Sequence, residues 1–484
     1  MPLREHHLKA SLETAAIVLV SALALPTSAD PDLWGHLRFG LDIVAARALP
    51  TADVYAFTSD RPWINHEWLS EVLMAVSYSA AGTSGLLTLK LALLAIFLAA
   101  TWFALRFAGA TPLWRFVGVV FSLVATLALF HSIRPQLWSL VCCSTLLALL
   151  LAHSRRCLIA APLLFVVWVN SHGGWVIGLL ILVVFLMADV AEGRVAIRTT
   201  IWTILACSCA TLVNPYGYKL LAFIGETVRT NREDITEWDP VLASKPYLTI
   251  WILCTVVLAG TAARRLSIRI IAPLTLAYLS WKVQRVTPFF TLVTIAAAIA
   301  TLTRTRRPPT VDRRFVGSDR VVAGGLAALV LSVSAFVWGA VAKRELQCIV
   351  VPPDGPDVVA AAEIGRLGLH GRMVTWFDWG EYAIWHFGPT LQVSMDGRRE
   401  TVYTPDTIQQ YRTFLMSGFK GWPALEMMTD YVWLPRRLPA ANFMTPRGWK
   451  PIISTPSSVV WARTGDLSAV GASSAEQREH CFPG

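Results

Sequence analysis

The sequence contains little charge. Only 15% of its 484 residues are Asp, Glu, Lys or Arg, whereas 55% are hydrophobic. Soluble proteins usually contain about 25% charged residues. This shortage of charge, together with a mean hydropathy of +0.52, excludes an ordinary soluble enzyme and is typical of a polytopic membrane protein.

Familiar enzyme motifs are also absent. The chain has no P-loop, no GxGxxG after a strand, no HExxH and no GxSxG. The net charge of +10 comes from short basic clusters between apolar runs, whereas a nucleic-acid-binding protein gathers its basic residues into one patch or stripe. We therefore expect membrane lipids, and no nucleic acid, among the partners.

Apolar runs approach the length of about 20 residues that a helix needs to cross a bilayer. They predict about 11 transmembrane helices, at residues 13–28, 84–106, 113–131, 137–152, 158–170, 174–190, 199–214, 247–262, 267–281, 288–303 and 320–341. The 20 tryptophans suit the aromatic belts at the two membrane interfaces.

The basic clusters predict the orientation. With about 11 spans, they all fall on the side of the N-terminus, which the positive-inside rule assigns to the cytoplasm. These clusters are Arg4 with Lys9, Arg106 with Arg115, Arg155 with Arg156, Arg194 with Arg198, Arg264 to Arg269, and Arg304 to Arg314. We expect a transmembrane domain over residues 1–341, with outer loops at about 29–70 and 214–246, and an extracytoplasmic domain over 342–484.

The extracytoplasmic domain has an α/β pattern. A helix is predicted over 356–369, and short β-branched and aromatic runs predict strands near 372–377, 390–395, 430–435, 451–456 and 458–463. The tail from about residue 468 has the composition of a disordered segment. Cys348 and Cys481 bracket the domain, and a disulfide and two free thiols are both compatible with the sequence.

The stretch "DPDLWGHLRFG" opens the first outer loop. Asp30 followed by Pro31 predicts a helix N-cap. On such a helix Asp32 and His36 share a face, and Arg38 lies roughly 120° away from Asp32. An Asp at the edge of the membrane suits either a general base or a ligand of a divalent cation. The same loop holds His66 and Glu67 as further candidates.

These residues resemble the first-loop motif of the oligosaccharyltransferase catalytic subunit, a GT-C glycosyltransferase. The Asp, His and Arg spacing of that motif falls on Asp32, His36 and Arg38. The resemblance implies a GT-C-like fold, a polyprenyl-phosphate-linked sugar as donor, and a catalytic Asp32 that helps to bind a metal ion such as Mg²⁺ or Mn²⁺. The wider layout of the chain is similar to that of bacterial integral membrane proteins, so we expect the bacterial inner (cytoplasmic) membrane.

A second stretch, "WFDWGEYAIW", resembles the Trp-Trp-Asp-Tyr-Gly motif of the same subunits. The resemblance implies that Trp376, Asp378 and Trp379 bind the acceptor. Ordinary packing of aromatic residues, with Asp378 as a helix cap, explains the stretch equally well.

A third stretch, "ITEWDP", loosely resembles the Thr-Ile-x-Glu element of those enzymes. Its Glu237 suits either a metal ligand or a loop cap. The second outer turn, "HSIRPQ", lacks the acid that metal-dependent relatives carry there. Glu67 or Glu237 would have to substitute for that acid in a metal site. Some GT-C enzymes work without a metal, with the first-loop Asp as base and arginines on the phosphate, so the resemblance leaves both alternatives open.

Two arginines are candidates for binding the donor phosphate. Arg134 and Arg285 each lie at the outer end of a predicted span, against the usual bias of basic residues toward the cytoplasm. A guanidinium group binds phosphate with two parallel hydrogen bonds, although both residues would also suit lipid headgroups or ion pairs. Three further candidates are His172 at an outer span end and Asp396 with Arg398 in the turn "SMDGRRE".

The sequence thus predicts a glycosyltransferase that moves a sugar from a polyprenyl-phosphate-linked donor to an unknown acceptor (a glycan, lipid or protein) at the outer face. A non-catalytic membrane scaffold is the first alternative, and a lipid or solute transporter is the second. Transporters place ionisable groups inside the bilayer, whereas this chain places its motifs at outer span ends.

Overall fold

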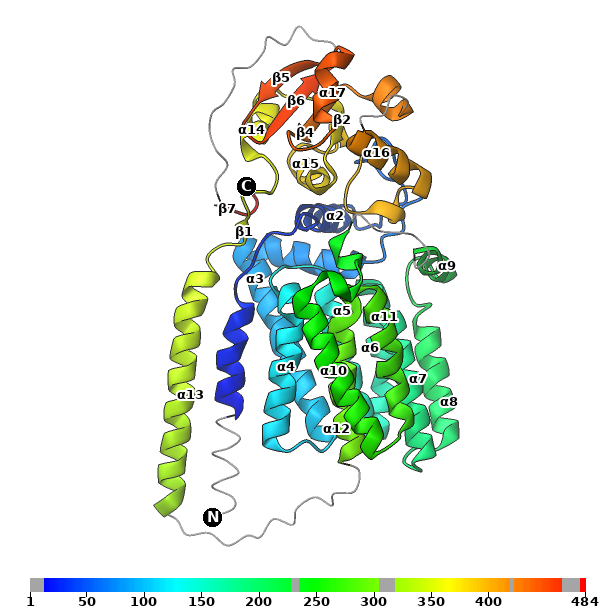
Figure 1. Cartoon of the computed structure of the whole chain (residues 1–484), viewed down its shortest axis with the longest axis vertical. Coiled ribbons are helices and arrows are strands. Elements are labelled where there is room, and N and C mark those ends of the chain that lie inside the picture. The colour runs from blue at the N-terminus through cyan, green and yellow to red at the C-terminus, as the bar shows by residue number, and fades with distance from the viewer. Residues whose placement is uncertain (1–12, 228–234, 304–317, 418–421, 464–478) are drawn as a thin grey trace. The chain divides into compact units, whose positions relative to one another are not determined.

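The computed structural model describes residues 13–227, 235–303, 318–417, 422–463 and 479–484 (Figure 1). The chain forms two compact units. Unit 1 comprises Met1–Thr27, Leu87–Tyr218 and Asn231–Gln347, and unit 2 comprises Ser28–Leu86, Lys219–Thr230 and Cys348–Gly484. The first predicted outer loop therefore belongs to the same unit as the C-terminal residues. Most of the predicted disordered tail lies outside the described residues.

Unit 1 is helical. Each of the eleven apolar runs falls on a helix, namely Glu13–Ala24, α3 (Trp68–Phe107), α4 (Pro112–Phe130), α5 (Gln136–Leu151), α6 (Arg155–Ser171), α7 (Trp175–Ala191), α8 (Ile197–Ala210), α10 (Lys245–Arg264), α11 (Ile271–Lys282), α12 (Thr287–Leu302) and α13 (Ser318–Glu345). Four helices in the described part of the chain are long and apolar enough to cross a membrane on their own: α3, α4, α10 and the segment Gln284–Leu302 that contains α12. A multi-pass membrane fold follows, and the number of spans stays a prediction.

Buried charge in unit 1 is paired within the helical bundle. Arg269 is fully buried and forms ion pairs with Asp189 and Glu192. Lys90 of α3 donates hydrogen bonds to the carbonyl groups of Leu25 and Pro26 at 3.2 and 3.0 Å. Each of these buried side chains therefore has polar partners inside unit 1.

Unit 2 contains a five-stranded sheet in the order β3-β2-β4-β6-β5. Its strands are β2 (Gly371–Thr375), β3 (Leu391–Val393), β4 (Tyr431–Pro435), β5 (Lys450–Ser454) and β6 (Ser458–Ala462). The strand β2 is parallel to β3 and β4, whereas β6 is antiparallel to β4 and β5. All five predicted strands and the predicted helix, α14 (Val358–Arg366), are therefore present.

The remaining elements of unit 2 are short. They are α9 (Tyr218–Thr227), α15 (Gly380–Phe387), α16 (Pro405–Ser417), α17 (Ala441–Met444) and the two-stranded pair of β1 (Val350–Val351) with β7 (His480–Cys481). A disulfide joins Cys348 and Cys481 beside that pair, so the sequence alternative of two free thiols is excluded.

Helix α2 (Leu33–Ala46) packs against α15 and against the end of the chain. The indole of Trp34 lies 5.3 Å from the ring of Tyr382 and 5.2 Å from the ring of Phe482. Its Nε1 donates a hydrogen bond of 2.8 Å to the carbonyl of Pro483. The buried face of α2 thus joins the first outer loop to the C-terminal residues.

Candidate active site

Asp32 occupies the N-cap position of α2, and its side chain does not cap the helix. The carboxylate of Asp30 instead accepts a hydrogen bond of 3.1 Å from the backbone N–H of Asp32. The predicted N-cap at Asp30 is therefore two residues too early, because Asp30 forms a turn ahead of the helix. Asp32 is half-buried and close to the surface of unit 2.

A second carboxyl group, from Glu381 of α15, lies beside Asp32. Both approach Gly397, where a Cβ would come within 2.2 Å of Asp32 Oδ1 and 2.7 Å of Glu381 Oε1. The other carboxyl oxygen of Glu381, Oε2, lies close to Gly35. A Cβ atom added at Gly35 would be only 2.1 Å from this oxygen. Only glycine at positions 35 and 397 leaves room for this acid.

Glu381 is 3% exposed, and its Oε2 has no hydrogen-bond partner among the described residues. Burial raises the pKa of Glu381, and the neighbouring carboxylates of Asp32 and Asp396 raise it further. Arg398 acts in the opposite direction, and the pKa remains well above the usual value for a glutamate. Burial among other acids favours the neutral form of a carboxyl group, which is the form of Glu381 that this raised pKa favours.

His36 faces Glu71 of α3. Its Nδ1 lies 3.1 Å from Glu71 Oε1, and Asn65 donates a hydrogen bond of 2.5 Å to the other carboxylate oxygen. Burial lowers the pKa of His36, but the hydrogen bond to Glu71 and the charges of Glu67 and Asp32 outweigh it and raise the pKa to about 9. At neutral pH His36 is therefore a cation within this acidic cluster, which comprises Asp32, Glu71, Glu381 and Asp396.

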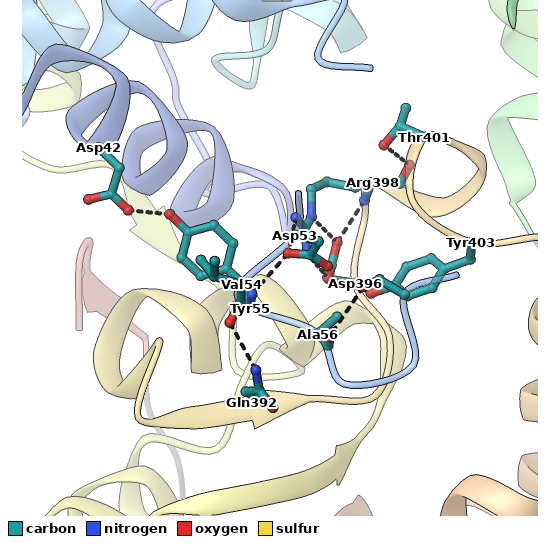
Figure 2. Close-up of polar contacts among 11 residues, drawn as sticks. Asp42, Asp53, Val54, Tyr55, Ala56, Gln392, Asp396, Arg398, Thr401 and Tyr403 are labelled. Atoms are coloured by element: carbon teal, nitrogen blue, oxygen red, sulfur yellow. Dashed lines mark hydrogen bonds and ion pairs between the residues drawn. The ribbon is translucent and has the colours of Figure 1, made fainter. Parts of the chain in front are cut away.

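Arg38 does not join the acidic cluster. Its Nε donates a hydrogen bond of 2.8 Å to Asp42, one turn along α2. The same carboxylate accepts a hydrogen bond from the hydroxyl of Tyr55 (Figure 2). Of the three residues that match the first-loop motif, only Asp32 and His36 are held together.

Arg398 lies between the carboxylates of Asp53 and Asp396 (Figure 2). Its two Nη atoms form ion pairs of 2.7 and 3.0 Å with the carboxylate of Asp53, and its Nε and Nη2 lie 2.8 and 2.7 Å from the two oxygens of Asp396. The guanidinium lies 4.8 Å from the ring of Phe39 and 4.7 Å from that of Trp63. Arg398 is thus a buried cation between two buried carboxylates, and the ligand roles expected for Arg398 and Asp396 stay predictions.

The aromatic motif of unit 2 is split between surface and core. Trp379 is buried, and its ring lies 5.0 Å from that of Trp433. Trp376 is half-buried and donates a hydrogen bond of 3.0 Å to Asp378 Oδ2. Burial raises the pKa of Asp378, an effect that this hydrogen bond and the charge of Arg437 oppose. Trp376 and Asp378 thus remain open to a ligand, whereas Trp379 belongs to the core.

His66 and Glu67 lie at the start of α3. Their side chains approach each other to 3.6 Å, and the ring of His66 lies 5.4 Å from that of Phe223 in α9. Glu67 acts on the acidic cluster through its charge, since it raises the pKa of His36. The structure therefore places these two candidates next to the cluster and not within it.

The two arginine candidates come together in unit 1. Glu237 forms an ion pair with Arg134 through Oε1, and its Oε2 lies 3.9 Å from Arg285 Nε. The guanidinium of Arg285 also lies 5.8 Å from the indole of Trp238. We call these three residues (Arg134, Glu237 and Arg285) the arginine–glutamate triad. Glu237 is the acid between the two arginines, and the roles expected for it, a metal ligand or a loop cap, stay predictions.

His172 forms a separate contact in unit 1. Its Nδ1 lies 2.6 Å from the hydroxyl of Ser139, which also accepts a hydrogen bond of 2.7 Å from Trp168 Nε1. The backbone N–H of Gly174 donates to the same ring nitrogen at 3.1 Å. This network fixes the turn between α6 and α7 and explains His172 without a ligand.

The residues around Asp32 do not fit a bound divalent cation. In the described part of the chain, no three His, Cys, Asp or Glu side chains are grouped to hold a metal ion. Glu71 is occupied by His36 and Asn65, and Asp396 by Arg398. The metal ion stays a prediction of the resemblance.

Sequence reasoning missed Glu381 and Asp53. Glu381 lies inside the quoted stretch "WFDWGEYAIW", at a position where the resembling motif has an aromatic residue. The presence of an acid in an otherwise apolar helical segment could have identified Glu381 as a candidate. No local sequence pattern could have identified Asp53, because its partner Arg398 is 345 residues away.

Comparison with solved structures identifies the fold. One similar structure is the archaeal oligosaccharyltransferase AglB of Archaeoglobus fulgidus in complex with an inhibitory peptide and a dolichol-phosphate. The alignment covers 89% of this chain and 69% of the AglB chain, with a TM-score of 0.55 and 10% sequence identity. A second similar structure is ArnT of Cupriavidus metallidurans bound to undecaprenyl phosphate. The alignment covers 96% of this chain and 99% of the ArnT chain, with a TM-score of 0.51 and 11% sequence identity.

The arabinofuranosyltransferase AftD from Mycobacteria is also similar. The alignment covers 95% of this chain and 40% of the AftD chain, with a TM-score of 0.50 and 15% sequence identity. No protein-family model matches the chain, and no curated protein matches its sequence. The structural neighbours are GT-C glycosyltransferases. The chain has the GT-C fold. The predicted fold is thereby confirmed, whereas the motif residues and their roles stay predictions.

Proposed function

We propose that this protein transfers a sugar from a polyprenyl-phosphate-linked donor to an acceptor hydroxyl group. The observation that carries the proposal is the arginine–glutamate triad. Arg134 and Arg285 come from turns that are far apart in the sequence, yet one carboxylate bridges them. Two guanidinium groups held side by side suit a phosphate group, and the neighbours AglB and ArnT have been solved with polyprenyl phosphates.

The proposed reaction needs a base for the acceptor and cations for the leaving group. Asp32 is the proposed base, which takes the proton of the acceptor hydroxyl while the hydroxyl oxygen forms a bond to the anomeric carbon of the sugar. The bond from that carbon to the phosphate oxygen breaks, and the electron pair leaves with the polyprenyl phosphate. Arg134 and Arg285 are the proposed cations, which stabilise the charge that develops on this leaving group.

Trp376 and Asp378 are the proposed acceptor contacts. An indole ring packs against the face of a sugar, and a carboxylate accepts hydrogen bonds from hydroxyl groups. Trp379, the third predicted contact, is buried and packs against Trp433.

The proposed location is the bacterial inner membrane, with the N-terminus in the cytoplasm and residues 342–484 outside. The Cys348–Cys481 disulfide supports this orientation, because disulfides persist in oxidising compartments and are rare in the cytosol.

Native mass spectrometry of detergent-purified protein tests the function. Wild type, Arg134→Ala and Arg285→Ala would be compared for retained polyprenyl-phosphate lipids. We expect the wild type to retain such a lipid and each variant to bind it about tenfold or more weakly, as for the loss of one charge-assisted contact. Arg366→Ala is the matched control, since Arg366 forms an exposed ion pair with Glu363. Retention of bulk phospholipid alone by every variant would favour the scaffold.

A further inference from the structure

A polar pocket lies at one end of the sheet of unit 2. Its cavity has a volume of about 400 Å³, which falls within the range of about 300–1,000 Å³ that small-molecule sites occupy. It forms where the parallel strands β2, β3 and β4 begin and where β6 ends. Trp376 and Asp378 follow the opposite end of β2, about 13 Å away along the strand. The pocket is therefore separate from the proposed acceptor contacts.

Hydrogen bonds fix the walls of the pocket. Asp430 Oδ2 accepts a hydrogen bond of 2.9 Å from the backbone N–H of Arg372, and the backbone N–H of Asp430 donates one of 2.9 Å to the carbonyl of Arg372. Arg463 donates through Nε to the carbonyl of Thr429 at 2.8 Å, and its two Nη atoms donate to carbonyl groups just before Thr429 in the chain. Arg463 thus serves as part of the wall, and the carboxylate of Asp430 is held in one position.

Three side chains that line the pocket keep polar groups available for a ligand. Arg372 is half-buried, and its guanidinium group lies 5.9 Å from the ring of Phe57 without an ion pair or hydrogen bond to any described residue. In the same part of the chain, Asp430 Oδ1 and Gln392 Oε1 accept no hydrogen bond. The amide of Gln392 is oriented by a hydrogen bond of 3.1 Å from its Nε2 to the carbonyl of Val54 (Figure 2).

These groups match the chemistry of one class of ligand. A guanidinium group binds a carboxylate through two parallel hydrogen bonds. Carboxylate and amide oxygens accept hydrogen bonds from hydroxyl groups. A sugar acid carries a carboxylate and several hydroxyl groups on one ring, so it offers a partner to each of the three side chains.

We propose that this pocket binds an acidic sugar, a pyranose that carries a carboxylate group. Arg372 pairs with the sugar carboxylate, whereas Asp430 and Gln392 accept hydrogen bonds from the ring hydroxyls. This inference goes beyond the proposed function and does not depend on it, because no residue of the pocket takes part in the proposed transfer.

Arg372→Gln tests the inference, because it removes the charge and keeps a planar polar side chain. Binding of methyl β-D-glucuronide and methyl β-D-glucoside, which differ in the carboxylate, would be measured by saturation-transfer difference NMR on the full chain in phosphatidylcholine nanodiscs. We expect wild type to bind the glucuronide about tenfold more tightly, as for one charge-assisted contact. Arg372→Gln should bind the two sugars equally.

Two further variants complete the design. Asp430→Asn should weaken the binding of both sugars about fivefold and keep the preference for the glucuronide, because both sugars donate hydroxyl hydrogen bonds. Arg366→Gln is the matched control, since Arg366 forms an exposed ion pair with Glu363, and it should behave as wild type. Thermal melting checks the folding of each variant.

Three outcomes would overturn the inference. Equal binding of the two sugars by wild type would mean that the pocket does not recognise the carboxylate. A preference that persists in Arg372→Gln would mean that the acidic sugar binds elsewhere. Acetate has a carboxylate and no ring hydroxyls, so it should displace the glucuronide only at a concentration at least about tenfold higher. Displacement at an equal concentration would show a simple anion site.

Discussion

The arginine–glutamate triad of unit 1 and the acidic cluster of unit 2 handle charge in opposite ways. In the triad, one acid lies between two cations and every partner is partly exposed. In the cluster, Glu381 lies beside Asp32 and Asp396 with one oxygen unpartnered, and it is almost completely buried.

This difference agrees with the proposed function, in which the triad binds an anion, and with the raised pKa of Glu381 in the cluster. A partly exposed cation pair attracts an anion at little cost in desolvation. Buried acids, by contrast, avoid repulsion by remaining protonated or by binding a buried cation. In the cluster, the raised pKa of Glu381 favours its protonated form, whereas Asp396 forms an ion pair with Arg398.

Removing the buried cation Arg398 should cause the largest loss of stability. Arg398→Ala leaves Asp53 and Asp396 buried without their partner, which typically costs about 3–5 kcal/mol of unfolding free energy. Thermal melting of the detergent-purified protein would show this loss. Arg366→Ala, which removes only an exposed ion pair with Glu363 in the same unit, should melt close to wild type. A small effect at Arg398 would mean that the two acids find other partners, and the contrast between the regions would weaken.

Filling the space around Glu381 should cause a smaller loss of stability. Gly397→Ala places a methyl group against both Asp32 and Glu381, and overpacking of this kind costs about 1–3 kcal/mol. Gly225→Ala is the control, since nothing lies within 4 Å of the added carbon there. Combining Gly397→Ala with Glu381→Ala should recover part of the loss. If the double variant melts no higher than Gly397→Ala, the acid does not fill this space.

The smallest expected effect is a change in how the stability of the protein depends on pH. Unfolded Glu381 titrates near 4.5, and its pKa in the folded protein is raised. Its contribution to stability is therefore complete below pH 4.5 and is lost as the pH rises through the folded-state value. Glu381→Gln removes this loss, so the variant should gain stability relative to wild type as the pH increases. Melting curves from pH 4.5 to 8 that run parallel for the two proteins would show that Glu381 keeps an ordinary pKa.

Local patterns predicted the helices and strands well. Each of the eleven apolar runs and five short strands matched an element, because hydrophobic runs and alternation are local properties. The N-cap of α2 was misplaced by two residues, since Asp30 and Asp32 both suit the start of a helix.

The candidate site was predicted less completely. Asp32 and His36 came from one short segment, but the neighbour of Asp32 is Glu381, which only the packing of α15 on α2 reveals. Arg38 has the right spacing for the site, yet the closer Asp42 binds it. Pairings across hundreds of residues, such as that of Asp53 with Arg398, leave no local pattern to detect.

The contact between Trp34 and Pro483 has a consequence for the order of synthesis. These residues are 449 positions apart, so α2 leaves the ribosome early and waits for almost the whole chain before its buried face is covered. The nascent protein therefore carries Asp32 on an incompletely packed helix until Phe482 and Pro483 arrive and Cys481 is oxidised. A protein lacking residues 479–484 should contain every predicted catalytic residue and still lack the mature packing around Asp32.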